Sequence, residues 1–342
     1  MRVAVVGGGW IAQSIVAAIE AAGSEVVGLC DLDEGRRHAW SDRAPTFESL
    51  DEAIAVAAPQ VAFVLTPTAT HAALAVAAMR AGLDVVIEKP LATSSAEVAD
   101  IVGAAAATGR TALVEESYLW MPSHARAIAD ITSGRIGAPR AITHTFYGWQ
   151  PVPEKVAAVA AANSTGWRAA GDHPWIRDHL VHLFALSKWL SGADRVAAVR
   201  SLGGPEETDV RGATWRAGGV DVVWVRASRG EEGLYGAARG LHTRVIGDEG
   251  YLDVLGEGGA WGDNGPRCAL RYGDGSIATV EDRPDLLWEA DVGYYPSAHD
   301  GAVRAALDAL NGGRSRVYTA ADAGGDVVAT EALIDSASAH AG

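Results

Sequence analysis

The chain has 342 residues, of which 49% are hydrophobic and 21% are charged, enough apolar material for more than one globular core. Its 28 basic and 43 acidic residues give a formal net charge of −15, which opposes binding to nucleic-acid phosphates and to anionic membranes. The two cysteines lie far apart, no apolar run reaches membrane-spanning length, and the start lacks a signal-peptide pattern. We therefore expect a soluble cytoplasmic protein with no nucleic-acid partner and no membrane partner.

The first third of the chain alternates segments that have the character of strands and of helices. Short apolar and β-branched runs predict strands at 3–6, 25–30, 61–65, 84–87 and 111–114. Intervening segments predict helices at 10–22, 34–41, 70–81 and 94–107. Ser94 and Glu97 form a capping-box pattern, and Gly82 follows the end of a helix. This alternation predicts a doubly wound parallel sheet over residues 1–118.

Beyond residue 118 the pattern changes, and we expect a second domain over residues 119–342. Helices are predicted at 122–133, 175–190, 299–311 and 320–338, a strand at 140–147, and a mobile excursion at 152–167. From 195 to 280 the chain consists of short strand-like runs with glycine turns, which is typical of an antiparallel sheet. The predicted fold class is α/β, with a Rossmann-type parallel sheet followed by an α+β domain whose sheet is largely antiparallel.

The turn between the first strand and the first helix carries a dinucleotide-binding pattern and reads Gly7-Gly8-Gly9-Trp10-Ile11-Ala12. In the pattern G-x-G-x-x-G/A, Gly7 permits the tight turn, Gly9 lets a pyrophosphate approach the backbone, and Ala12 keeps the helix close to the strand. The peptide groups around Trp10 and Ile11 would then face the phosphates from the helix N-terminus. The alternative is a strand-to-helix turn that binds no ligand.

Asp31 ends the second strand, where Rossmann domains carry the acid that binds the ribose. A carboxylate there accepts hydrogen bonds from ribose hydroxyls and repels a 2′-phosphate, so we predict NAD as the cofactor, with NADP less favoured. Arg36 and Arg37 follow nearby, and they either soften this preference or are solvated residues of the next helix.

Two further groups follow the third and fourth strands, at the edge where open α/β sheets bind ligands. Thr66, Pro67 and His71 follow the third strand, and Glu88 and Lys89 follow the fourth. We assign all five to the cofactor side of the site. Lys89 is in addition the predicted catalytic ammonium, whereas His71 either positions its loop or caps the following helix.

These motifs resemble those of the Gfo/Idh/MocA family of NAD(P)-dependent sugar and cyclitol oxidoreductases. The resemblance covers nearly the whole chain and rests on the glycine turn, on T-P-x-x-x-H at 66–71, on E-K-P-L at 88–91 and on the closing pattern from His299 to Ala339. It implies that Lys89 lies in the active site and that the peptide bond before Pro90 is cis.

The family also carries D-x-x-x-H on a helix of its second domain, and Asp178 and His182 match this motif. Separation by four places both on one helix face, and a histidine that titrates near neutral pH suits the removal of a hydroxyl proton. The resemblance implies that Asp178 and His182 bind substrate and move its proton, with His179 beside them. The alternative is a core histidine, His182, paired with Asp178. We expect no metal site because His179 and His182 have no obvious third ligand.

Two departures from the family pattern are expected to add bulk near the substrate. Asp172-His173-Pro174 replaces a frequent glycine triplet, and Leu180 replaces the glycine within the helical motif. His173 is either a substrate contact or a loop residue near the helix cap. The predicted aromatic wall comprises Tyr118, Trp120, Tyr147, Trp149 and Trp167, with core packing as the alternative. We assign substrate binding to Lys89, Trp149, Trp167, His173, Asp178, His179 and His182.

The predicted function is hydride transfer between NAD(H) and a CH–OH or keto carbon of a small polyhydroxylated substrate: a sugar, cyclitol or glycoside. Lys89, Asp178 and His182 form the predicted catalytic group. Two alternatives stay open: a glycoside hydrolase that retains NAD and oxidises its substrate transiently, and a non-enzymatic sensor of NAD or sugar. The resemblance implies a homo-oligomer, a dimer or tetramer, with its interface on the antiparallel sheet.

Overall fold

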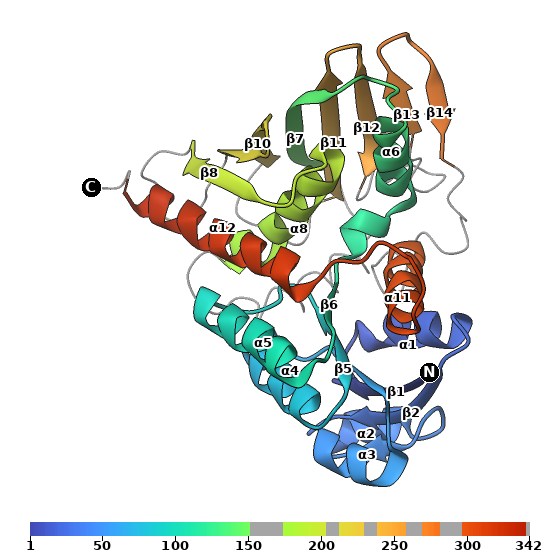
Figure 1. Ribbon diagram of the computed structural model, residues 1–342. Coiled ribbons are helices and arrows are strands. Elements are labelled where there is room, and N and C mark those ends of the chain that lie inside the picture. The colour runs from blue at the N-terminus through green and yellow to red at the C-terminus, as the bar shows by residue number, and fades with distance from the viewer. Residues whose placement is uncertain (151–173, 203–211, 229–237, 258–268, 281–295, 340–342) are drawn as a thin grey trace. The chain divides into compact units, whose positions relative to one another are not determined.

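The computed structural model describes residues 1–150, 174–202, 212–228, 238–257, 269–280 and 296–339. The chain divides into two compact units (Figure 1). The first unit comprises Met1–Ser117 and Ala298–Val327, and the second comprises Tyr118–Ser297 and Val328–Gly342. The sequence analysis places a boundary between two domains near residue 118, and this boundary stays a prediction. In the described part of the chain, no helix is both long enough and apolar enough to cross a membrane.

The first unit is built on a parallel sheet of six strands in the order β3-β2-β1-β4-β5-β6. These strands are β1 (Arg2–Val6), β2 (Glu25–Cys30), β3 (Thr46–Phe47), β4 (Val61–Val64), β5 (Asp84–Glu88) and β6 (Ala112–Glu115). From the central pair β1 and β4, the strand order runs outward to β3 on one side and to β6 on the other. The sheet is therefore doubly wound, and that prediction is confirmed. β3 is an element that the sequence pattern did not predict.

Helices cover both faces of this sheet, as Figure 1 shows for α4 and α5 on one side and for α1 on the other. They are α1 (Ala12–Ala21), α2 (Glu34–Trp40), α3 (Leu50–Ala57), η1 (Thr68–Thr70), α4 (His71–Arg80) and α5 (Ser95–Thr108). The central strands are apolar throughout because both of their faces are buried, as in Val3–Val6 and Val61–Val64. The capping pattern is confirmed, since Ser94 Oγ accepts a 3.3 Å hydrogen bond from the Glu97 N–H.

A late segment of the chain completes the first unit. Val303 and Leu307 of α11 (Pro296–Leu310) pack into the same apolar core as α1. The Val114 N–H of β6 then donates a 2.8 Å hydrogen bond to the Tyr318 carbonyl, which extends the edge of the sheet. The parallel sheet therefore draws on residues that lie about 200 positions away from it in the sequence, a separation that local patterns do not reveal.

The second unit contains an eight-stranded sheet in the order β14-β13-β12-β11-β7-β10-β9-β8. Its strands are β7 (Pro139–Gln150), β8 (Val196–Ser201), β9 (Gly212–Ala217), β10 (Val220–Ser228), β11 (Ala238–Gly247), β12 (Tyr251–Glu257), β13 (Ala269–Tyr272) and β14 (Ile277–Thr279). The prediction of a largely antiparallel sheet is confirmed, and the parallel pair β7–β10 is the exception within it.

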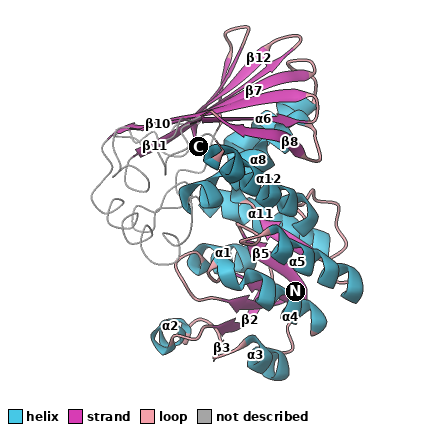
Figure 2. Cartoon of the chain, turned by 90° about the vertical axis from the view of Figure 1, so that its left-hand side faces the viewer, coloured by secondary structure: helices cyan, strands magenta, loops and turns pink. Residues whose placement is uncertain are grey.

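Helices lie along one face of this second sheet, and Figure 2 shows its strands fanned above them. They are η2 (Ser117–Trp120), α6 (Pro122–Thr132) and α8 (Pro174–Ser191), while α12 (Ala320–Ser338) closes the chain and is shared between the units. His144 of β7 links α8 to the sheet, because its ring nitrogens lie 3.0 Å from Ser187 Oγ and 2.9 Å from Thr243 Oγ1. Complete burial lowers the pKa of His144 to about 3, so this ring is neutral at physiological pH.

Candidate active site

The turn after β1 has a shape that only glycine permits at its first position. Gly7 has φ +103°, and a Cβ on it would lie 2.8 Å from the Leu65 carbonyl oxygen. Its N–H donates a 2.8 Å hydrogen bond to the carbonyl of Cys30 at the end of β2. The turn therefore lies against the ends of both β2 and β4, which places it at the carboxyl edge of the sheet.

The third glycine borders open space. A Cβ at Gly9 would have no protein atom within 4 Å, although a Cβ at Gly8 would meet Leu29 at 3.0 Å. Trp10 and Ile11 complete the turn, and Ala12 begins α1 fully buried. An open approach to backbone N–H groups at the start of a ten-residue helix suits a pyrophosphate.

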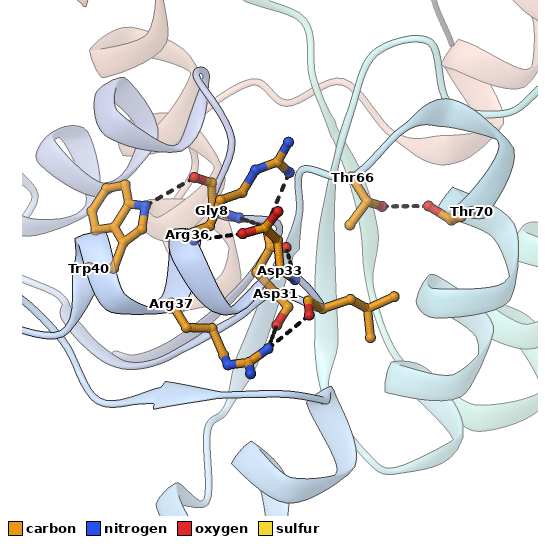
Figure 3. A network of polar contacts seen from close by, with 9 residues as sticks. Gly8, Asp31, Asp33, Arg36, Arg37, Trp40, Thr66 and Thr70 are labelled. Atoms are coloured by element: carbon orange, nitrogen blue, oxygen red, sulfur yellow. Dashed lines mark hydrogen bonds and ion pairs between the residues drawn. The ribbon is translucent and has the colours of Figure 1, made fainter. Parts of the chain in front are cut away.

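Asp31 follows β2 and lies at the centre of a network of polar contacts around this turn (Figure 3). Its Oδ2 accepts a 2.8 Å hydrogen bond from the Gly8 N–H and lies 3.4 Å from Nη1 of Arg36. Its Oδ1 accepts a 2.9 Å hydrogen bond from the Asp33 N–H. Only 8% of the Asp31 side chain is exposed, so the carboxylate is fixed in direction before any ribose binds.

Trp40, the last residue of α2, is a contact of the turn that the sequence analysis missed. Its Nε1–H donates a 3.0 Å hydrogen bond to the Gly8 carbonyl (Figure 3). Gly8 is thus held at its N–H by Asp31 and at its carbonyl by Trp40. A tryptophan at the end of the helix that follows the ribose acid was the available signal, but its partner lies 32 residues earlier in the chain.

The two arginines of α2 have different surroundings. Arg36 leaves 56% of its side chain exposed beside Asp31. Arg37 instead donates to main-chain carbonyls, at 2.7 Å to Asp31 and at 3.0 Å to Leu32 (Figure 3). The exposed Arg36 can therefore contact a cofactor that binds beside Asp31. Arg37 instead supports the backbone of Asp31.

The residues after β4 are held together by His71. Its Nε2 lies 2.7 Å from the Thr66 carbonyl and its Nδ1 lies 2.9 Å from the Pro90 carbonyl, so the imidazole links the loops that follow β4 and β5. Pro67 precedes η1, and Thr66 and Thr70 share a 2.7 Å hydroxyl contact. Burial lowers the pKa of His71, although its hydrogen bonds to the main-chain carbonyls act in the opposite direction.

Glu88 and Lys89 lie at the end of β5 in the same unit. Glu88 is buried, Lys89 is half-buried, and the Lys89–Pro90 peptide bond is cis, as the family resemblance implied. In the parallel register Glu88 pairs with Glu115 of β6, whose Oε1 lies 3.0 Å from Nδ1 of the buried His299. The carboxyl edge of the sheet thus presents one ammonium group beside buried carboxylates.

The second predicted group lies in the second unit, on α8 and η2. Nδ1 of His179 lies 3.5 Å from Oδ2 of Asp178, and both His179 and His182 are buried. The ring of His182 stacks on that of Tyr118, with centroids 4.0 Å apart and planes inclined by 11°. Trp120 packs edge-on against Trp189 at 5.6 Å, in agreement with the core-packing alternative for that residue.

The structure therefore assembles the predicted residues into two clusters, each within its own unit. The first joins Gly7, Gly9, Asp31 and the loops carrying His71 and Lys89, and the second joins Asp178, His179 and His182. Trp167 and His173 lie outside the described residues, as do the side chains of Tyr147 and Trp149. The open space at Gly9 and the fixed carboxylate of Asp31 fit a bound NAD.

Comparison with known proteins agrees with this reading of the first unit. A family model described as an oxidoreductase family with an NAD-binding Rossmann fold matches residues 1–116. Inositol 2-dehydrogenase 1 of Saccharopolyspora erythraea is 35% identical over 152 residues, which are 41% of this chain and 43% of that protein. D-apiose dehydrogenase of Paraburkholderia graminis is 28% identical over 184 residues, 52% of this chain and 46% of that protein. The chain thus spans about half the length of the curated relatives that it matches.

Solved structures resemble the chain over nearly its whole length. An oxidoreductase from Agrobacterium radiobacter, in complex with NAD+, L-tartaric acid and magnesium, aligns with a TM-score of 0.78 at 18% identity over 99% of this chain and 96% of that one. The WlbA dehydrogenase of Bordetella pertussis, in complex with NADH and UDP-GlcNAcA, aligns with a TM-score of 0.74 at 21% identity over 99% and 96% of the two chains. At these identities the likeness establishes the fold.

Proposed function

Residues 1–116 belong to the Gfo/Idh/MocA family of NAD-binding oxidoreductases, and on this premise we propose that the protein is an NAD-dependent dehydrogenase or ketoreductase of a small polyhydroxylated substrate. The observation that carries the proposal is the position of Lys89. It follows β5 at the carboxyl edge of the sheet, where the turn at Gly7 and the carboxylate of Asp31 also lie. The edge that would hold the cofactor therefore also presents a cation for the reacting oxygen.

Bound NAD+ would supply the acceptor for a hydride that leaves the substrate carbon. The protein supplies the remaining chemistry. The Lys89 ammonium stabilises negative charge that develops on the substrate oxygen, and the His182 imidazole takes the hydroxyl proton. Asp178, which lies four residues before His182 on α8, stabilises the positive charge that this proton places on His182. The buried surroundings of His179 and His182 exclude water from the proton transfer.

Sugars, cyclitols and glycosides are the substrate classes that we propose. The curated relatives named above are dehydrogenases of inositol and of D-apiose, which are polyhydroxylated molecules. Leu180, which replaces a glycine of the family motif, is fully buried, so its added bulk lies inside the protein. The replacement adds volume to α8 and removes no reactive group.

The test is a spectrophotometric assay of the purified full-length protein with NAD+ and a panel of sugars, cyclitols and glycosides, with NADP+ in parallel. Growth of reduced-nicotinamide absorbance with one compound class supports the proposal and identifies the substrate class. The proposal is contradicted if the protein binds NAD tightly but neither reduces NAD+ with any compound of the panel nor oxidises NADH with the corresponding keto compounds. Mass spectrometry of the products would then separate a hydrolase that retains NAD from a sensor that leaves every compound unchanged.

We also propose a cytoplasmic homo-oligomer. The outward side of the second sheet exposes apolar side chains, namely Val223, Val225 and Ile246. Exposed apolar side chains on a sheet face lose contact with water when a partner surface covers them, which favours association. Light scattering should give a dimer or a tetramer, and Val225→Asp should reduce its mass. A monomeric mass at micromolar concentration would contradict the assembly.

A further inference from the structure

The contact between Tyr118 and His182 joins two residues that are 64 positions apart in the sequence, and no motif relates them. The rings lie face to face, and His182 is 5% exposed. Tyr118 is the first residue of the second unit, and only Glu116 and Ser117 separate it from β6. A parallel ring stack at 4.0 Å fixes the plane of the imidazole, because any rotation about its side-chain bonds would separate the faces or bring them into collision.

Tyr118 is itself held from two directions. Its carbonyl lies 2.6 Å from Nδ1 of His124, which is fully buried in α6. The rings of Tyr118 and His124 also approach, with centroids 5.9 Å apart and planes inclined by 36°. The next residue, Leu119, is completely buried, which anchors the turn of η2 in the core. These contacts hold the backbone and the ring of Tyr118 beside His182.

A tyrosine face has a definite electrostatic effect on the imidazole that it covers. The negative π face attracts a cation, so it favours the imidazolium over the neutral ring. Burial acts in the opposite direction, because it penalises the charged form. For a buried histidine that accepts a proton, such a face offsets part of the penalty that burial imposes on the charged form.

We propose that Tyr118 is the positioning residue of His182: its ring holds the imidazole plane and stabilises the protonated imidazole. The inference deepens the proposed function, since it rests on His182 as the group that takes the hydroxyl proton. Tyr118 acts through His182, and the stack requires the aromatic face and not the phenolic hydroxyl.

Other titratable groups surround the same helix, and the test must hold them constant. Asp178, His179 and the buried Lys188 lie on α8 itself. His124 lies on α6 and His144 on β7, and both helix and strand pack against α8. Substitution of Tyr118 alone leaves each of these groups in place, so a change in the titration of His182 reports the ring.

The experiment is an NMR titration of His182 in the full-length protein, with its imidazole signal assigned by its absence in His182→Gln. Tyr118→Phe keeps the π face, so the His182 pKa should stay within about 0.2 pH units of the wild-type value. The ring-current shift of the His182 signal should also be retained. Tyr118→Leu removes the face, so the pKa should fall by roughly half to one unit and the ring-current shift should disappear. Tyr118→Trp offers a stronger face and should keep or raise the pKa, which preserves the test if the leucine variant does not fold.

Trp120→Leu is the matched control, because Trp120 lies two residues away in the same turn but packs on Trp189. It should leave the His182 titration unchanged. An unchanged titration in Tyr118→Leu, a lowered pKa in Tyr118→Trp, or a Tyr118→Phe variant that behaves like the leucine variant would overturn the proposal. The titration needs no turnover. The two proposals can therefore fail separately. If the Tyr118 variants change the His182 pKa as expected but the protein oxidises no compound of the panel, the dehydrogenase assignment is refuted and the contact between Tyr118 and His182 keeps its role.

Discussion

Trp40 Nε1 donates a 3.0 Å hydrogen bond to the carbonyl of Gly8, a residue whose N–H is already bound by Asp31 at 2.8 Å. The middle glycine of the dinucleotide turn is therefore held at both of its polar groups, by the side chain that follows β2 and by the last side chain of α2. A turn fixed in this way needs little further ordering when a cofactor binds, which favours affinity.

Trp40→Phe tests this support, because phenylalanine keeps most of the apolar packing and loses the indole N–H. The free energy of unfolding should fall by about 1 kcal/mol, the net value of one buried hydrogen bond. The affinity for NAD+ should fall severalfold, since the turn must then be ordered on binding. Chemical denaturation and calorimetric titration measure the two effects. Wild-type NAD+ affinity in Trp40→Phe would show that the contact only stabilises the fold.

Asp31→Ala should weaken NAD+ binding by about tenfold or more, because the variant loses charge-assisted hydrogen bonds to the ribose and to Gly8. NADP+ should lose less, since the carboxylate that repels its 2′-phosphate is also removed. Calorimetric titration of both cofactors measures the difference, and Asp31→Asn separates the charge from the hydrogen bond. Equal losses for both cofactors would remove the basis for the NAD preference.

The two arginines of α2 provide a matched pair. Arg36→Ala should leave NAD+ affinity within about threefold, since its exposed ion pair contributes little. The same variant should weaken NADP+ binding more than NAD+ binding, because Asp31 then faces the 2′-phosphate without a neighbouring cation. Arg37→Ala removes two bonds to main-chain carbonyls and should weaken both cofactors equally. The account of these residues fails if Arg37→Ala changes the ratio of the two affinities and Arg36→Ala does not.

His144 predicts a dependence of stability on pH. Its folded pKa of about 3 lies below the ordinary histidine value, so the fold favours the neutral ring. As pH falls below about 6.5 the unfolded chain binds a proton that the folded chain does not, and stability decreases with falling pH. Between pH 7 and pH 5 this group alone should cost about 2 kcal/mol. In His144→Gln, the loss of unfolding free energy between pH 7 and pH 5 should be smaller by this amount, as measured by chemical denaturation at both pH values. A loss equal to that of the wild type would refute the assignment.

Much of the fold could be predicted from the sequence because its signals are local. The bounds of α12 agree with the prediction of 320–338, and the strands of the first unit were found from apolar runs that parallel sheets require. The short β3 was missed because a two-residue strand has no periodicity to detect. The helix α3 was missed although its buried Leu50 and Ala53 have helical spacing and Ser49 caps it. The return of residues 298–327 to the first unit and the parallel pairing of β7 with β10 depend on contacts between distant segments.

The candidate site divides in the same way. The positions of Asp31 and Lys89 at strand ends follow from spacing, and the structure has both there. The support of Gly8 by Trp40 and the stack of Tyr118 on His182 could not be predicted, since each joins residues that only the tertiary structure brings together. The catalytic roles of Lys89, Asp178 and His182 remain predictions.

The most direct test of the central claim is the turnover of Lys89→Ala and Lys89→Arg with NAD+ and the substrate class found in the panel, alongside their NAD+ affinities. Removal of a group that stabilises charge only in the transition state should reduce kcat in Lys89→Ala by about 100-fold or more, while NAD+ affinity stays within about threefold. Lys89→Arg should recover part of the rate because it retains the positive charge. Turnover of Lys89→Ala near the wild-type rate would contradict the account, since hydride transfer would then proceed without the cation at the end of β5.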